Sequence, residues 1–326
     1  MGSIPFTTRQ GRARCTGILS LAALSWAALA GGAAAQAGPG GGGGVSFGGA
    51  FSLGLSDYGG DDGLDGTAGT LDFGGTFSSG PVSLDMDLDA TGTNDGEGLG
   101  IDSNRGVDVA ARYQFSPALG AGTYIARDSI DFGGGDRQNL DSYGIEMFYD
   151  TPRWQTRLSI GETELDDAAD DIDVIDYGLA TRFDLQNGFT LFASGVLSRG
   201  DIGDTTFDSS AAGIGAAYAF GNGIEAFGSY HRTTSDDLDA TLNSTSVGAA
   251  YTLYAAGQPV ILSGEYTHLN GDTVGGASDG RRIAIGATIP LGDTSARKRL
   301  PGNTLTGNVL EGDRTATGGV LTGIGF

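Results

Sequence analysis

The chain has 326 residues, and its 40 acidic side chains against 18 basic ones give a formal net charge of −22. This acidic excess excludes nucleic acid as a partner, because too few cations are present to neutralise phosphates. The single cysteine, Cys15, excludes a disulfide framework, so the fold must be closed in another way.

The first 36 residues are predicted to be a secretory signal peptide. A start with three arginines precedes an apolar core at residues 18–30 and an Ala-Ala-Ala cleavage site at residues 33–35. The apolar core is short for a membrane-spanning helix. Residues 37–44, which include six glycines, are predicted to be a flexible linker.

From residue 45 onward the sequence predicts β-strands. The clearest example is the stretch in which Val82, Leu84, Met86 and Leu88 alternate with polar residues. A strict period of two is typical of a strand with one apolar and one polar face. Fourteen such stretches are expected, at residues 45–55, 71–77, 82–89, 107–115, 120–130, 143–149, 154–160, 175–185, 189–198, 214–220, 224–231, 247–253, 260–266 and 283–291.

The connections between these strands follow a regular order. Short turns such as Gln186-Asn187-Gly188, in which Asn-Gly favours a tight hairpin, alternate with polar loops. The loops are expected at residues 58–66, 91–104, 133–139, 165–171, 199–206, 235–239 and 270–280. Six turns alternating with seven loops require about fourteen strands with both ends on the turn side.

This order predicts an all-β, antiparallel, up-and-down transmembrane β-barrel over residues 45–292, with short periplasmic turns and acidic outer loops. Beyond the leader no apolar run approaches the roughly 20 residues of a spanning helix. Aromatic residues also gather beside the short turns, as in an interfacial girdle: Tyr113, Phe115, Phe148, Tyr149, Trp154, Phe183, Phe189, Tyr218, Phe220, Tyr251 and Tyr254. A soluble β-sandwich is the alternative, but it gives no reason for the asymmetry between turns and loops.

The C-terminal tail, residues 293–326, has no clear alternation. It is predicted to be either a periplasmic extension or a weak extra hairpin formed by residues 304–310 and 317–326, which would make sixteen strands. Fourteen strands are favoured.

If the apolar faces point to lipid, the polar faces line the lumen. The charged candidates for the pore lining are Asp72, Asp85, Asp87, Asp89, Asp108, Arg112, Glu146, Arg157, Asp176, Arg182, Asp184, Glu225, Glu265 and Arg282. Opposed acids and arginines in a pore order water and select ions by sign, and the acidic excess predicts a weak preference for cations.

The sequence leaves two alternative functions open. A barrel hydrolase would need a histidine base; His231 is expected to face the lumen beside Ser229, but no third orienting acid is specified, so we expect neither an enzyme nor a cofactor. A structural or adhesive barrel with a closed lumen is the second alternative. Aspartate pairs in the loops, such as Asp61-Asp62, suit cations that bridge lipopolysaccharide, although no segment matches a calcium loop.

The segments YGLATRFDLQNGFTLFASG and VGAAYTLYAAGQPVILSGEY resemble the Gram-negative outer-membrane porins of alphaproteobacterial type, and the similarity covers residues 45–291. The resemblance implies export to the outer membrane, contact with its lipid and lipopolysaccharide, passive diffusion of small hydrophilic solutes and ions, and often a homotrimer. The chain departs from that family in two features. Family members usually have sixteen strands and one long loop folded into the lumen, whereas fourteen strands are favoured here and no loop is obviously long enough. They also usually end on an aromatic residue that closes the last strand, whereas the last clear strand here ends at residue 291.

Overall fold

The computed structural model describes residues 44–60, 65–94, 101–132, 137–166, 173–185, 187–202, 205–235, 239–255, 257–273, 276–292, 301, 303–315, 318–319 and 321–322. The predicted signal peptide and all but the last residue of the predicted linker lie outside these residues, as do the aspartate pair 61–62 and the end of the chain.

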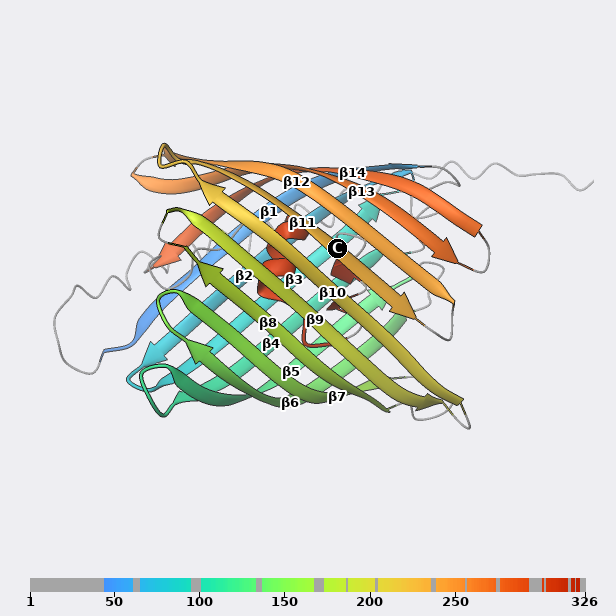
Figure 1. Ribbon diagram of the computed structural model, residues 1–326, viewed down its shortest axis with the longest axis horizontal. Coiled ribbons are helices and arrows are strands. Elements are labelled where there is room, and N and C mark those ends of the chain that lie inside the picture. Colours follow the sequence, from blue (N-terminus) through green and yellow to red (C-terminus); the bar gives the residue numbers. More distant parts are fainter. Residues whose placement is uncertain are drawn as a thin grey trace, which may run out of the picture. The chain divides into compact units, whose positions relative to one another are not determined.

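Fourteen antiparallel strands form a closed barrel in which every strand pairs with its neighbours in the sequence and β1 pairs with β14 (Figure 1). At the closure, Phe51 of β1 lies opposite Ile289 of β14 and, on the other side, Phe73 of β2. The predicted all-β, up-and-down barrel of fourteen strands is confirmed. The strands are β1 (Ser46–Gly60), β2 (Gly66–Ser79), β3 (Val82–Asn94), β4 (Ser103–Gln114), β5 (Leu119–Asp131), β6 (Arg137–Asp150), β7 (Trp154–Asp166), β8 (Asp173–Asp184), β9 (Phe189–Ile202), β10 (Thr205–Ala219), β11 (Ile224–Ser235), β12 (Ala240–Ala255), β13 (Gln258–Thr273) and β14 (Gly276–Gly292).

Six short connections lie at the end where β1 begins, here named the turn end, and seven lie at the opposite loop end. Gly188 of the β8–β9 turn has φ +85°, a backbone conformation that glycine adopts without steric cost. Two of the predicted loops are much shorter than expected, because β9–β10 and β13–β14 continue as paired strands through most of residues 199–206 and 270–280. Polar pairs hold these extensions together: Arg199 donates to Asp208, and Asn270 donates to Asp279 at 2.6 Å.

The two faces of the strands differ as the alternation predicts. Leu55, Ile125 and Leu197 are among the many large apolar side chains that are more than half exposed on the outside. Aromatic residues near the turn end are exposed too, and Tyr254 has 77% of its surface accessible. Among the described residues, no helix is both long enough and apolar enough to cross a membrane.

The described residues of the C-terminal tail lie inside the barrel. These residues, 301, 303–315, 318–319 and 321–322, are here named the lumen insert, and they contain helix α2 (Leu305–Glu311) (Figure 1). The Thr304 side chain accepts a hydrogen bond from the Gly307 N–H and so caps α2. The insert is therefore neither a periplasmic extension nor an extra hairpin. The pairing of β1 with β14 leaves no free strand edge to which a hairpin could add.

Candidate functional site: the lumen and its insert

One side of the lumen is an apolar contact surface for α2. Leu305 and Val309 are fully buried against Phe192, Ala217, Phe227 and Ala250, which come from β9 to β12. Burying a side chain of this size stabilises a structure by about 1.5–3 kcal/mol. The inner face of the barrel is therefore not polar throughout, because on this side it carries the apolar residues that contact α2.

Glu265 of β13 holds the first turn of α2. Its carboxylate accepts hydrogen bonds from the backbone N–H groups of Leu305 at 2.7 Å and Thr306 at 3.1 Å, and from the Thr306 hydroxyl at 2.9 Å. Arg282 of β14 donates to Glu265 at 3.3 Å and to the Asn303 carbonyl at 2.9 Å. A carboxylate at the first turn of a helix also interacts favourably with the helix dipole.

Arg157 of β7 contacts the other end of α2. Its guanidinium donates to the carbonyl oxygens of Glu311 at 3.0 Å and Gly312 at 2.6 Å. These carbonyls belong to the last turn, where a helix lacks internal donors and a cation is favourable. Both ends of α2 are thus bound by charged wall residues.

After α2 the chain crosses to the opposite wall, where Arg314 joins two carboxylates. It pairs with Asp108 of β4 and with Glu146 of β6, whose oxygen lies 3.1 Å from Arg314 Nη2. Glu146 also pairs with Arg112, which in turn pairs with Asp85. The Arg314 guanidinium lies 5.1 Å above the centre of the Tyr124 ring.

Two ionisable groups of the insert are perturbed by these surroundings. Burial alone would lower the pKa of Arg314, but the carboxylates of Asp108 and Glu146 outweigh it and hold this pKa above its usual value. Burial raises the pKa of Asp313 to about 7, although the hydrogen bond from Thr322 and the charge of Arg157 oppose the shift.

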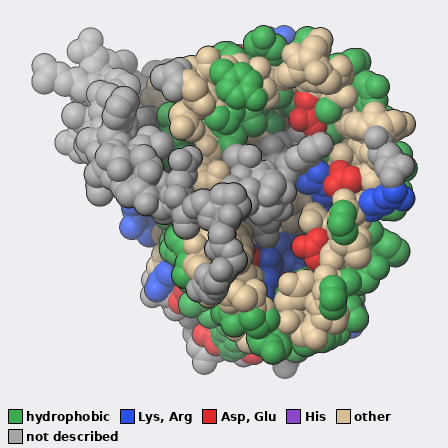
Figure 2. All heavy atoms as spheres, turned by 90° about the vertical axis from the view of Figure 1, so that its left-hand side faces the viewer, with side chains coloured by type: hydrophobic (Ala, Val, Ile, Leu, Met, Phe, Trp, Pro, Cys, Tyr) green, Lys and Arg blue, Asp and Glu red, His purple; other side chains and the backbone are tan. Residues whose placement is uncertain are grey.

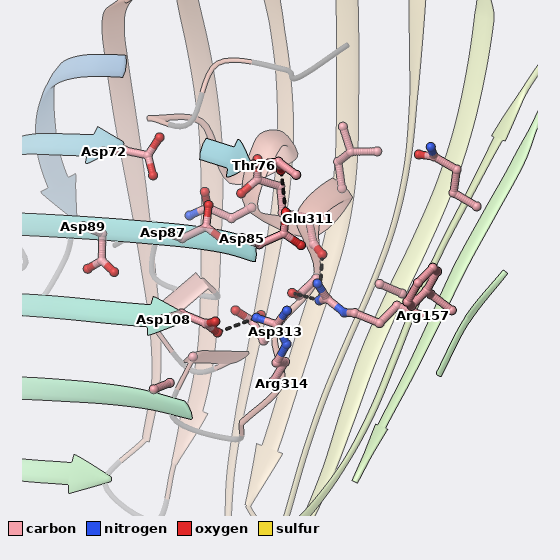
Figure 3. Close-up of a pocket in the computed structure, with 18 of the residues that line it drawn as sticks. Asp72, Thr76, Asp85, Asp87, Asp89, Asp108, Arg157, Glu311, Asp313 and Arg314 are labelled. Atoms are coloured by element: carbon pink, nitrogen blue, oxygen red, sulfur yellow. Dashed lines mark hydrogen bonds and ion pairs between the residues drawn. The ribbon is translucent and has the colours of Figure 1, made fainter. Parts of the chain in front are cut away.

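The side of the lumen opposite α2 carries an acidic wall. A cavity of about 580 Å³ runs beside it, and it is lined by nine carboxylates and five arginines among the described residues. Figure 3 shows Asp72, Asp85, Asp87, Asp89 and Asp108 on neighbouring strands, with Arg157 on the far side and Arg314 between them. Figure 2, which views the turn end, shows acidic and basic side chains together in the hollow of the barrel.

The predicted lumen residues fall into three groups. Cavity-lining residues are Asp72, Asp85, Asp87, Asp89, Asp108, Arg112, Arg157, Arg182 and Arg282. Glu146 and Glu265 bind the insert instead. The others lie elsewhere on the inner wall: Asp176 accepts from Thr163 and Ser198, Asp184 pairs with Arg182, and Glu225 follows the same alternation as Phe227. Their role in ion selection stays a prediction.

The predicted candidates did not include Asp128 of β5 or the insert's Glu311, Asp313 and Arg314, all of which line the cavity. Asp128 faces inward like Tyr124, but β5 has the weakest alternation of the strands. For the insert residues the sequence holds no signal, because the tail has no strand pattern.

His231 and Ser229 lie on the inner face without forming a nucleophile–base pair. His231 is buried beside the insert, with only 2% of its surface exposed. Ser229 exchanges hydrogen bonds with Ser246 at 2.8 Å and Thr306 at 3.1 Å. Its hydroxyl is thus part of the contact between the wall and α2.

No protein-family model matches this chain. No curated protein matches it either. Among solved structures, the outer membrane channel DcaP of Acinetobacter baumannii is similar with a TM-score of 0.50 and 14% identity, over 76% of this chain and 97% of that one. The anion-selective porin from Comamonas acidovorans has a TM-score of 0.47 and 10% identity, over 76% of this chain and 99% of the porin. The likeness to DcaP shows a shared barrel fold.

Proposed function

We propose that this barrel is an outer-membrane channel through which small hydrophilic solutes and ions diffuse passively, with a weak preference for cations. The observation that carries the proposal is the charged cavity inside an exterior of exposed apolar side chains. A polar interior with an apolar outer band is typical of barrels that conduct through a membrane. Among the described residues, nine carboxyl groups line the cavity against five arginines, and this acidic excess favours cations.

The first test is single-channel conductance of refolded residues 37–326 in a planar bilayer under a potassium chloride gradient. We expect stepwise conductance and a reversal potential of the sign that marks cation preference. A protein that is folded and inserted but electrically silent would overturn the proposal.

The preference is tested by neutralising the acidic wall. We expect the variant Asp87→Asn, Asp89→Asn, Asp128→Asn to lower the ratio of potassium to chloride permeability about twofold or more, since it removes charge from the cavity. Asp85 is left intact because it pairs with Arg112. Asp141→Asn is the matched control: Asp141 pairs with Arg127, and both alternate with the inward-facing residues of their strands.

A closed structural or adhesive barrel is the second candidate, and the lumen insert favours it because it fills part of the lumen. The same conductance measurement separates the two. A homotrimer in contact with lipid and lipopolysaccharide is also part of the proposal, and the mass of the detergent-solubilised protein checks its stoichiometry.

A further inference from the structure

We infer that the lumen insert is a fixed internal wall of the channel: it limits the conductance, and its Arg314 reduces the channel's preference for cations. This inference rests on the proposed function, because it assigns the size and charge of that same pathway to a segment outside the fourteen strands.

The described part of the insert extends from the turn-end half of the lumen to the loop end. Strand β14 ends at Gly292 on the turn end, and the described part of the insert begins at Pro301. Helix α2 then lies against β8 to β12. Further along, Leu321 packs against Ile130 and Leu140, which lie where β5 ends and β6 begins, at the loop end. The insert therefore runs along the lumen rather than closing one mouth.

The wall is shaped to hold it. Gly213 of β10 faces Val309, and a Cβ at Gly213 would lie 2.6 Å from Val309 Cγ1. Glu265 and Arg282 are almost fully buried, and both bind insert backbone atoms. Without the insert, Glu265 would lose its hydrogen bond from the Leu305 N–H, and Arg282 would lose its hydrogen bond to the Asn303 carbonyl. Charged side chains that only line a water-filled lumen do not need such backbone partners. The insert is thus a docked part of the fold.

The position of Arg314 determines its effect on ions. It projects from the insert onto Asp108 and Glu146, across the cavity from α2, as Figure 3 shows for Asp108. The cavity is lined both by the acidic wall and by the insert, so Arg314 compensates negative charge on the surface that an ion in the cavity meets. The electrostatic interaction between Arg314 and an ion in the cavity is strong, because little water and few salt ions lie between them to screen it.

Two variants separate size from charge. A chain that stops after Gly292 lacks the insert and tests its size; we expect the single-channel conductance to rise at least twofold, because the lumen is wider. Arg314→Gln keeps the insert; we expect the ratio of potassium to chloride permeability to rise about twofold. Arg314→Lys, which keeps the charge, should restore the original ratio.

The control is Arg127→Gln, which removes the same charge from an exposed pair with Asp141 on the outer face and should change neither quantity. If the shortened chain does not fold, Leu305→Asp with Val309→Asp serves instead, because carboxylates in the apolar contact surface expel α2 without shortening the chain.

The outcomes distinguish the inference from the proposed function. Equal conductance and selectivity in the full-length chain, the insert-free barrel and Arg314→Gln would overturn the inference and leave the channel intact. A silent full-length barrel, with folding verified, overturns the proposed function and the inference together; if the insert-free barrel then conducts, the insert closes the lumen instead of limiting its conductance.

Discussion

Glu265 shows how a single buried side chain can depend on a segment far away in the sequence. It has 4% of its surface exposed, and its carboxylate receives two backbone N–H groups, a hydroxyl and the Arg282 guanidinium. A buried carboxylate needs such partners, because an unpaired one costs several kcal/mol. Its burial and the docking of α2 therefore depend on each other.

We expect Glu265→Gln to weaken docking of the insert by about 2 kcal/mol, because the amide nitrogen cannot accept the hydrogen bonds that one carboxylate oxygen accepts. The rate at which a hydrophilic maleimide labels Val309→Cys measures this docking, since Val309 is fully buried and Cys15, in the predicted leader, is the only natural cysteine. Labelling should become roughly thirtyfold faster. Glu164→Gln, on the exposed face of β7, is the control, and an equal acceleration there would contradict the assignment.

Asp313 gives the insert a dependence on pH. Its pKa is raised from 3.8 to about 7 in the folded protein, chiefly by burial, so its docked form favours the protonated carboxyl. The contribution to docking is fully present below about pH 4 and is lost as pH rises through about 7. Arg157 opposes this shift and Glu311 adds to it.

We therefore expect faster labelling of Val309→Cys at pH 8 than at pH 5, relative to Asn222→Cys in an exposed turn, which corrects for ionisation of the thiol. In Asp313→Asn the ratio of the two rates should no longer change with pH. A pH-dependent ratio that survives this substitution would assign the effect to another group.

At the scale of elements, the strands were predictable because their pattern is local. Each strand carries its own period of two, and the pairs Val82/Leu84 and Tyr177/Leu179 alternate with polar neighbours whatever the rest of the chain does. The ends of β9, β10, β13 and β14 were predicted too short, because Asp, Gly and Asn indicate loops even where cross-strand pairs such as Arg199–Asp208 support a ladder.

The lumen insert was not predictable in the same way. Residues 305–311, LTGNVLE, form only two helical turns with a glycine among them, and so short a helix is unstable alone. Its stability comes from Phe192, Phe227 and Glu265, which meet only when the barrel has closed. The predicted lumen acids lie on the inner wall because their position follows from the local alternation. The insert partners of Glu146 and Glu265 could not be predicted, because they lie in a segment without such a pattern.

The contact between β10 and α2 can be tested through its glycine. Gly213→Ala places a methyl group against Val309, and we expect it to weaken docking by about 1–3 kcal/mol, as overpacking does in protein cores. Gly264→Ala is the matched control, since the nearest atom to a Cβ there is 4.0 Å away. The single-channel conductance should change in Gly213→Ala and stay unchanged in Gly264→Ala.

At the scale of the whole molecule, the barrel separates three environments. The exterior is apolar, the acidic wall faces the cavity, and the insert fills the side formed by β8 to β13. Closure satisfies the backbone hydrogen bonds of all fourteen strands laterally, which is what a barrel needs in lipid. A soluble barrel would have no reason to expose so many large apolar side chains.

The exterior therefore supplies a test of the membrane environment itself. Ile145 is 58% exposed near the middle of β6, whereas Tyr254 is exposed at the turn end of β12. In a membrane, Ile145→Arg should destabilise the barrel by about 2–4 kcal/mol and Tyr254→Arg by about 0–1 kcal/mol, because the cost of a cation falls from the bilayer centre to the interface. Reversible urea unfolding in lipid vesicles measures both.

If the barrel worked in water, each substitution would change the free energy of unfolding by no more than about 0.5 kcal/mol, since both side chains are exposed. A clear excess for Ile145→Arg would place the apolar exterior in lipid, and equal small values would contradict that placement.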